Sequence, residues 1–350
     1  MPTDVRLAGD SLELPGGVLV SFIRTLRLPE NGTYPLPPGL GQFPLRRVAD
    51  YPDTVPEEWR RRGGVMLPVY QREAMWLKFS ALEPAALKVG VGKVCAVSGE
   101  SWTTTLVRKP QNYVPLPQQP WLDGINSGKG TVRQFVAMPL GLGATVEGQV
   151  TGTEQWGGVQ LAVHGLTEAA RTAWQAQRIT PEWLGAGAET VAVAGYGGLS
   201  GAPPAPGALP ASGAPPAPGA APRSPGGRAM GLGAGGTMRQ EVYADSRPIG
   251  DYRPEPDGRV FVHLASAAEW QQITGEPAPP TPVTAKTYAM HGLPWFDYYD
   301  TDADDLPPAD ELSAVRPTGH WIPDDGPDTA IDTPLPIVPL DGKPVQDGQW

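Results

Sequence analysis

The chain has 350 residues, of which 44 are glycine, 43 are proline and 18% are charged. This length is sufficient for two domains with cores of their own, and the Gly and Pro content predicts many turns. The formal net charge of −10 argues against nucleic acid or an anionic membrane as the partner. The sequence shows neither a run of about 20 apolar residues nor a secretory leader, so we expect a cytoplasmic protein without a membrane span.

The first 196 residues contain several short segments in which β-branched and apolar residues are bounded by Gly or Pro, as in strands. The expected strands are Gly17–Leu28, Leu87–Val97, Thr103–Val107, Thr131–Met138, Ala144–Val150 and Val159–His164. The expected helices are at 56–62, 71–79 and 167–178. Short strands separated by turns favour a mainly β N-terminal domain at 1–196, built as a sandwich or a partly open barrel.

Residues 197–236 consist almost entirely of Ala, Pro and Gly. The string SGAPPAPGA occurs twice there, at Ser200–Ala208 and at Ser212–Ala220. Proline interrupts helices and sheet ladders, and the segment has few large apolar side chains to bury. We therefore expect a disordered Ala/Pro/Gly-rich linker that joins two folded parts.

The part after the linker is strongly acidic, because residues 237–350 contain 20 of the 37 acidic residues and 7 of the 27 basic ones. The expected elements are strands at Gln240–Tyr243 and Arg259–Leu264 and helices at Ser266–Thr274 and Thr284–Met290. Ser266 and Glu269 form a capping box for the first of these helices. The pattern predicts a small α+β module at 237–312, followed by an extended Pro/Asp-rich tail at 313–350.

The strings LPVYQREAMWLKF, PQQPWLDGI, VRQFVAMPLGLG and GLPWFDYYD are distributed over both folded parts. In these strings the chain resembles a family of bacterial proteins of uncharacterised function. The resemblance covers most of both parts but not the linker, and it implies a recurring architecture. It implies no activity, ligand or catalytic residue.

Motifs for nucleotide binding and nucleophilic catalysis lack their structural context. GLGAGG at Gly231–Gly236 matches the dinucleotide-binding pattern, but the expected linker precedes it where a strand is required. GINSGKGT at Gly124–Thr131 misses the spacing of a phosphate-binding loop and is typical of a hairpin turn. Cys95, the single cysteine, is expected to be a buried apolar residue, and the sequence leaves open whether it meets a histidine.

The acidic run at 297–311 is the main candidate for a metal site. Asp300, Asp302 and Asp304 occupy positions 1, 3 and 5 of a calcium-binding loop, and Glu311 occupies position 12. Position 6, which needs glycine for a sharp turn, is Asp305 instead. Calcium binding and a solvated acidic loop therefore both stay open.

The 11 tryptophans provide a second kind of candidate site. Aromatic side chains beside acids and amides can stack on sugar rings or anchor protein interfaces, although most large aromatic side chains belong to cores. The candidate binding residues are Trp121, Asp123, Trp156, Trp295, Tyr298 and Tyr299.

The sequence favours a non-enzymatic structural or protein-interaction role, because it combines abundant aromatic residues with a tether and an acidic region and shows no catalytic constellation. The expected partner is another protein. The first alternative is a carbohydrate- or small-molecule-binding protein that uses surfaces rich in Trp and Asp. The second alternative is a metal-dependent enzyme that uses the Asp300–Asp304 cluster.

Overall fold

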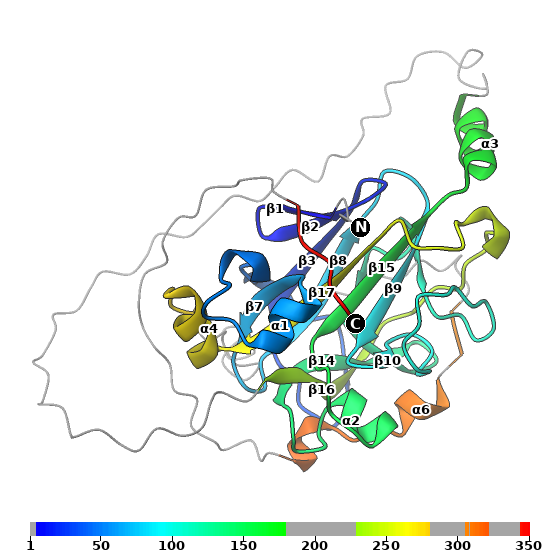
Figure 1. Cartoon of the computed structure of the whole chain (residues 1–350). Helices are drawn as coiled ribbons and strands as arrows, with labels where there is room; N and C mark the ends of the chain where they lie inside the picture. Colours follow the sequence, from blue (N-terminus) through cyan, green and yellow to red (C-terminus); the bar gives the residue numbers. More distant parts are fainter. Residues whose placement is uncertain (1–4, 180–228, 281–304, 308, 322–343) are drawn as a thin grey trace, which may run out of the picture. The chain divides into compact units, whose positions relative to one another are not determined.

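The computed structural model describes residues 5–179, 229–280, 305–307, 309–321 and 344–350 (Figure 1). Nearly all of the described residues belong to one compact unit, which comprises 1–171 and 226–350. Residues 172–179 are the described part of a second unit, 172–225. The first unit is mainly β, which confirms the predicted fold class.

Most elements of the first unit are strands of a single, largely antiparallel sheet. The strands are β1 (Arg6–Ala8), β2 (Ser11–Leu14), β3 (Val18–Thr25), β4 (Thr33–Tyr34), β5 (Gly39–Gln42), β6 (Arg46–Arg47), β7 (Val65–Val69), β8 (Ala74–Ser80), β9 (Ala85–Val91), β10 (Val94–Cys95), β11 (Val114–Leu116), β12 (Trp121–Leu122), β13 (Gly124–Gly128), β14 (Thr131–Pro139), β15 (Val159–Gly165), β16 (Met230–Arg239) and β17 (Gly258–Ser266). The helices are η1 (Val48–Asp50), α1 (Glu57–Arg62), α2 (Val146–Thr151), α3 (Glu168–Ile179), η3 (Ile249–Asp251), α4 (Ala267–Thr274), α6 (Asp310–Ser313) and η4 (Thr318–His320).

The sheet consists of two runs of neighbouring strands. One run is β1–β2–β3–β8–β14–β16, and the other is β6–β7–β17–β15–β9, with β10 and β11 beside β9. The pairing of Met230 with Leu264 connects β16 to β17 and so joins the runs. Two pairs are parallel, β4 with β16 and β7 with β17.

Apolar side chains from both runs belong to one hydrophobic core. Phe22 and Leu77 come from the first run, whereas Val89, Leu161 and Val262 come from the second, and all five are fully buried. Strand side chains alternate between two faces. The residues between these core positions on β9, β15 and β17 therefore lie on the opposite face, which carries the candidate site.

The structure corrects the predicted division into two separately cored parts. β16 begins at Met230, inside the stretch 197–236 that was predicted to be a linker, and it pairs along its length with β14. β17 pairs with β15 and β7, so strands from both sides of this stretch complete one sheet. Glycine allows close approach in β16, because a Cβ on Gly236 would lie 2.2 Å from the carbonyl oxygen of Pro29.

Several expected elements are confirmed, and others take a different form. The expected strands at 17–28, 131–138, 159–164 and 259–264 correspond to β3, β14, β15 and β17, α1, α3 and α4 are present, and residues 124–139 form a hairpin. Residues 71–79, expected to be helical, supply β8, whereas 144–150, expected to be a strand, supply α2. The expected strand 87–97 bends at Gly92 into the β9–β10 hairpin. Residues 103–107 and 240–243 lie outside the strands.

The expected helix at 284–290 and the central part of the predicted tail lie outside the described residues. Among the residues that the structure does describe, none of the helices combines the length and the apolar composition needed to cross a bilayer.

Candidate functional site

Aromatic side chains gather on the face of β17 that lies opposite the core. Phe261 and His263 project from β17, with their ring centroids 4.5 Å apart. Trp59 stacks on His263 at 4.5 Å, and Trp156 and Trp350 lie 6.0 and 5.8 Å from Phe261. We call the following residues the aromatic cluster: Trp59, Trp102, Trp156, Phe261, His263 and Trp350.

Four cationic side chains lie against these rings. Arg62 lies 5.0 Å from the ring centroid of Trp156, and Lys93 lies 5.1 Å from the same ring. Arg259 lies 4.6 Å from Trp350, and Lys88 lies 5.6 Å from Trp102. A cation over an aromatic face is stabilised by the ring quadrupole, more strongly where water is excluded. The cluster is therefore a cationic–aromatic layer that is buried at Trp59, Arg62, Lys88, Phe261 and His263 and partly open to solvent at its other members.

His263 is neutral within this cluster. Its ring is fully buried, and burial together with the nearby Arg62 lowers its pKa to about 3, against a hydrogen bond to the Gly63 carbonyl that acts in the opposite direction. His263 Nε2 lies 3.0 Å from that carbonyl oxygen, so the neutral ring donates through Nε2–H. The ring thereby fixes residue 63 beside β17.

Residues 344–350 run across this face beside α1 and β17 (Figure 1). Val345 N donates to the Val5 carbonyl at 2.7 Å, and its side chain is buried in the main core. On the other side of the segment, Gly64 N donates to the Gln346 carbonyl, and Gln349 N donates to the Arg61 carbonyl at 3.0 Å. The segment is therefore held in extended form by backbone contacts along both of its edges.

Side chains fix the position of the segment. Asp347 accepts a hydrogen bond from Arg259 Nε at 2.8 Å and another from Trp350 Nε1 at 2.7 Å. A Cβ on Gly348 would lie 2.1 Å from the Arg61 carbonyl oxygen, so only glycine fits there. We call the surface formed by Val5, Arg61–Gly64 and Arg259 the segment groove.

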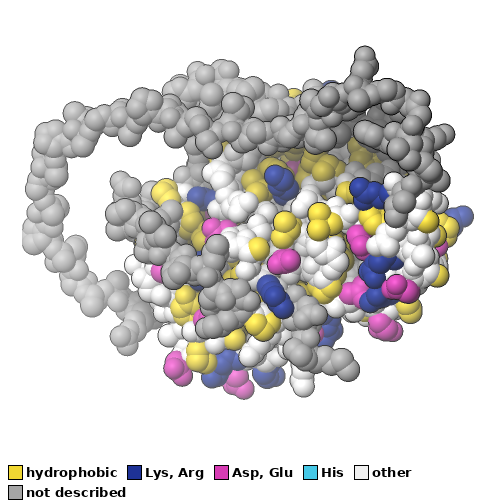
Figure 2. Space-filling model, turned by 90° about the horizontal axis from the view of Figure 1, so that it is seen from above, with side chains coloured by type: hydrophobic (Ala, Val, Ile, Leu, Met, Phe, Trp, Pro, Cys, Tyr) yellow, Lys and Arg dark blue, Asp and Glu magenta, His cyan; other side chains and the backbone are white. Residues whose placement is uncertain are grey.

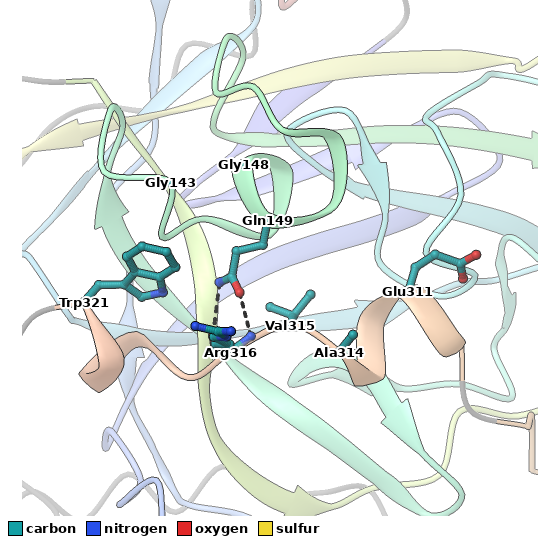
Figure 3. A pocket seen from close by; sticks show the side chains of 8 residues that line it. All are labelled: Gly143, Gly148, Gln149, Glu311, Ala314, Val315, Arg316 and Trp321. Carbon is teal, nitrogen blue, oxygen red and sulfur yellow. Dashed lines mark hydrogen bonds between the residues drawn. The ribbon is translucent and has the colours of Figure 1, made fainter.

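A separate pocket of about 400 Å³ lies between α2 and the stretch from α6 to η4 (Figure 3). The Trp321 ring borders one end of it, and Glu311 borders the other. Gln149 Oε1 accepts from Arg316 N at 2.6 Å, and Gln149 Nε2 donates to the Arg316 carbonyl at 3.1 Å. These two bonds tie α2 to the segment that carries Trp321. We call this the Trp321 pocket.

A carboxylate organises the loop on the α2 side of the pocket. Glu154 accepts hydrogen bonds from the backbone N–H groups of Gly141, Gly143 and Thr145 and from the Thr145 hydroxyl. Burial acts to raise the pKa of Glu154, but these hydrogen bonds prevail and lower it. The loop wall that contains Gly143 is therefore fixed by an ionised side chain.

A second hollow, of about 350 Å³, lies on the other side of the same loop. It is lined mainly by apolar groups, which include Val69, Pro139, Leu142 and Met230. Leu142 is 37% exposed and Trp321 is 36% exposed, two of the four large apolar side chains that the described part of the chain leaves open to solvent. We call this hollow the Leu142 groove.

Of the predicted binding residues, the structure describes Trp121, Asp123 and Trp156, and these three do not form one site. Trp121 pairs with Lys78 between β12 and β8, whereas Trp156 belongs to the aromatic cluster. Asp123 is 1% exposed, and burial raises its pKa well above the usual value, against a smaller lowering by Trp121. Asp123 therefore presents no carboxylate at the surface, where a sugar-binding residue was predicted.

The predicted calcium loop is only partly described. Glu311 lies on α6 and lines the Trp321 pocket. The remaining predicted residues, Asp300, Asp302, Asp304, Trp295, Tyr298 and Tyr299, lie outside the described residues. Within the described part of the chain, no three His, Cys, Asp or Glu side chains come close enough to hold a metal ion.

The structure excludes one histidine partner for Cys95, His164. Cys95 is buried, as predicted, and its thiol donates to the Asn112 carbonyl at 3.4 Å. Cys95 pairs with Gly90 of β9, whereas His164 pairs with Ala86 of the same strand. Four residues of strand correspond to about 13 Å, so Cys95 and His164 do not form a dyad.

Most residues of these surfaces were missed from the sequence, among them Arg259, Asp347, Trp350 and Trp321. One signal was present, because Arg259, Phe261 and His263 alternate with the core residues of β17 and thus mark a second face of that strand. No local pattern shows that residues 344–350 return to that face.

No family model matches this chain. No curated protein and no solved structure is similar to it either. The function therefore has to be argued from the surfaces just described.

Proposed function

We propose that this chain is a non-enzymatic protein-interaction protein, and that its contact surface comprises the Trp321 pocket and the Leu142 groove. The observation that carries the proposal is the position of Trp321, a large aromatic side chain left 36% exposed at the mouth of a pocket. Tryptophan, with tyrosine and arginine, is enriched among the residues that contribute most binding energy in protein interfaces.

The chemistry around Trp321 supports a protein partner. The backbone of Arg316 is bonded by Gln149, and its guanidinium is exposed next to the pocket with His320 Nε2 at 3.1 Å. Aromatic residues and Arg are enriched in interfaces, and an exposed guanidinium group suits the polar rim that surrounds the centre of such interfaces. Leu142 extends the apolar part of the surface toward the adjoining groove.

The surface is preorganised, which reduces the entropy lost on binding. Three sets of contacts hold the stretch from α6 to η4. Arg133 donates to the Val315 carbonyl, and Glu30 accepts from the Thr318 hydroxyl at 3.1 Å. Gln149 forms hydrogen bonds with both the N–H and the carbonyl of residue 316. Glu154 holds the facing loop.

The face shown in Figure 2 carries no continuous positive surface among the residues described there, because Lys and Arg side chains are interspersed with Asp and Glu side chains. Nucleic acids require continuous positive surfaces that neutralise several phosphates.

The experiment compares three full-length chains that are immobilised and exposed to soluble protein from the source organism. We expect the wild-type chain and a Leu82→Ser variant to retain the same proteins, because Leu82 is 78% exposed and lies outside both hollows. The double variant Leu142→Ser/Trp321→Ser should lose them at least tenfold in quantitative mass spectrometry. Equal retention by all three chains would refute the proposed surface.

A further inference from the structure

We infer that the segment groove is a recognition site for an extended polypeptide, and that it accepts the 344–350 segment of a second copy of this chain. In this structure the groove holds the segment of its own chain. The inference concerns a different surface from the Trp321 pocket and goes beyond the proposed function.

The backbone contacts are those of peptide recognition by strand addition. Residue 344 forms a bridge with Arg6, and Asp347 forms a bridge with Gly63. Such main-chain bonds supply affinity for any extended chain, whichever molecule provides it.

Side chains give the groove its selectivity. Along the segment, Val345 enters the main core, Asp347 pairs with Arg259, and Trp350 covers the Arg259 guanidinium at 4.6 Å. An apolar residue, an aspartate two positions later and an aromatic residue three positions after that make a short recognition motif. The charge pair fixes the register, because side chains of 12% and 30% exposure leave it largely shielded from water.

Two glycines shape the contact between groove and segment. A Cβ on Gly63 would lie 2.4 Å from the Gln346 carbonyl oxygen, and Gly348 is equally restricted by Arg61. One glycine belongs to the groove and the other to the segment, so the two backbones are matched to each other.

The chain connection permits exchange between molecules. Residues 322–343 separate Trp321 from the segment by 22 residues. A connection of that length spans at most about 75 Å when extended, which is enough to reach a neighbouring molecule. Binding of the segment to the groove of its own chain (the cis contact) benefits from a high effective concentration. Exchange between molecules can therefore be detected only after this cis contact has been weakened.

The experiment uses two full-length charge-reversal variants, Arg259→Asp and Asp347→Arg. In each variant the cis pair becomes repulsive, so each chain alone should be monomeric. In a mixture, the altered, basic segment of the Asp347→Arg chain matches the altered, acidic groove of the Arg259→Asp chain. The unaltered segment and the unaltered groove of the two chains also match each other. We expect a mixed dimer, detected by energy transfer between labelled chains and by light scattering, at least tenfold tighter than self-association of either variant.

The double variant Arg259→Asp/Asp347→Arg is the matched control, because it restores the cis pair and should remain monomeric. Excess free peptide with the wild-type 344–350 sequence should dissolve the mixed dimer. If either variant fails to fold, Trp350→Ala weakens the segment without altering its charge and should bind the labelled peptide where the wild-type chain does not. Folded variants that neither dimerise on mixing nor bind the peptide would overturn the inference.

Discussion

Lys88 is a cation placed where water cannot reach it. It is 1% exposed on β9, and its Nζ donates to the Thr105 carbonyl at 2.5 Å beneath the Trp102 ring. Burial lowers its pKa to about 8, against smaller opposite effects of Cys95 and Glu100. The folded chain therefore releases this proton at a lower pH than the unfolded chain, whose lysine titrates near 10.5.

Replacing Lys88 by methionine should change the pH dependence of stability. Between pH 8 and pH 10 the unfolded state of the wild-type chain binds more protons than the folded state, so its free energy of unfolding rises with pH. We expect Lys88→Met to remove this rise, as measured by urea unfolding followed through Trp fluorescence. The substitution Lys78→Met, at an exposed lysine, should leave the slope of the free energy of unfolding against pH as in the wild-type chain. An unchanged slope in Lys88→Met would show that Lys88 does not cause the rise.

Glu269 should produce a slope of opposite sign at lower pH. It is 9% exposed in the first turn of α4, and burial raises its pKa to about 7 against a hydrogen bond from the Ser266 backbone N–H, which lowers it. Between pH 4.5 and pH 7 the folded state holds a proton that the unfolded state lacks, so stability falls as pH rises.

We expect Glu269→Gln to remove this decrease and to be more stable than the wild-type chain above pH 7, as measured by thermal unfolding from pH 4.5 to pH 8. Glu57→Gln, an exposed replacement in the first turn of α1, provides the comparison. Equal destabilisation of Glu269→Gln at every pH would contradict the prediction. It would indicate that the substitution removes a contact and that Glu269 binds no proton on folding.

At the scale of single elements, β16 shows what glycine contributes to the sheet. Gly236→Ala would bring a methyl group against the Pro29 carbonyl, 2.2 Å from the ideal Cβ position. Overpacking of this kind costs about 1–3 kcal/mol. We expect a loss of that size in urea unfolding, whereas Gly250→Ala, which meets no atom within 4 Å, should change stability by about 0.5 kcal/mol or less. Equal effects would argue against the close packing of β16.

Local sequence rules predicted an element correctly where residues adjacent to it in the sequence determine its boundaries. The α4 boundaries were predictable, because Ser266 Oγ accepts from Glu269 N and Gly275 adopts the left-handed conformation. They failed at β8, where helix-forming residues such as Glu73 and Met75 precede or enter a strand. β8 pairs with both β3 and β14, and these distant partners override local propensity.

The candidate surfaces were less predictable than the elements. Trp156 was identified from the aromatic residues beside acids and amides and Glu311 from the spacing of a calcium-binding loop, and each lies on one of the surfaces described. Their neighbours come from remote parts of the chain: Arg259 meets Asp347, and Gln149 meets Arg316. A single sequence shows which side chains have binding chemistry but contains no local signal for such pairings.

At the scale of the whole molecule, the two sides of the Ala/Pro/Gly-rich stretch behave as one folded unit. β14–β16 and β15–β17 are long antiparallel pairs whose partners come from opposite sides of it. Strands with a common core unfold together in a cooperative transition.

Cutting the chain within that stretch should therefore leave the unit intact. A protease site inserted between residues 205 and 206 and cleaved in the native protein should yield two fragments that co-elute on size exclusion. The same cut after denaturation, analysed without refolding, gives the separated fragments for comparison. Separation of the fragments under native conditions would show that the shared sheet does not hold them together.

The parallel pairing of β7 with β17 has a consequence for how the protein is made. Val65 meets Val262, so the strand that covers β7 is synthesised about 200 residues later. Until β17 leaves the ribosome, β7 and β15 present unpaired edges, which other chains can use to aggregate. We therefore expect co-expressed chaperones and slower synthesis at reduced temperature to increase the yield of soluble protein, measured as the soluble fraction after expression.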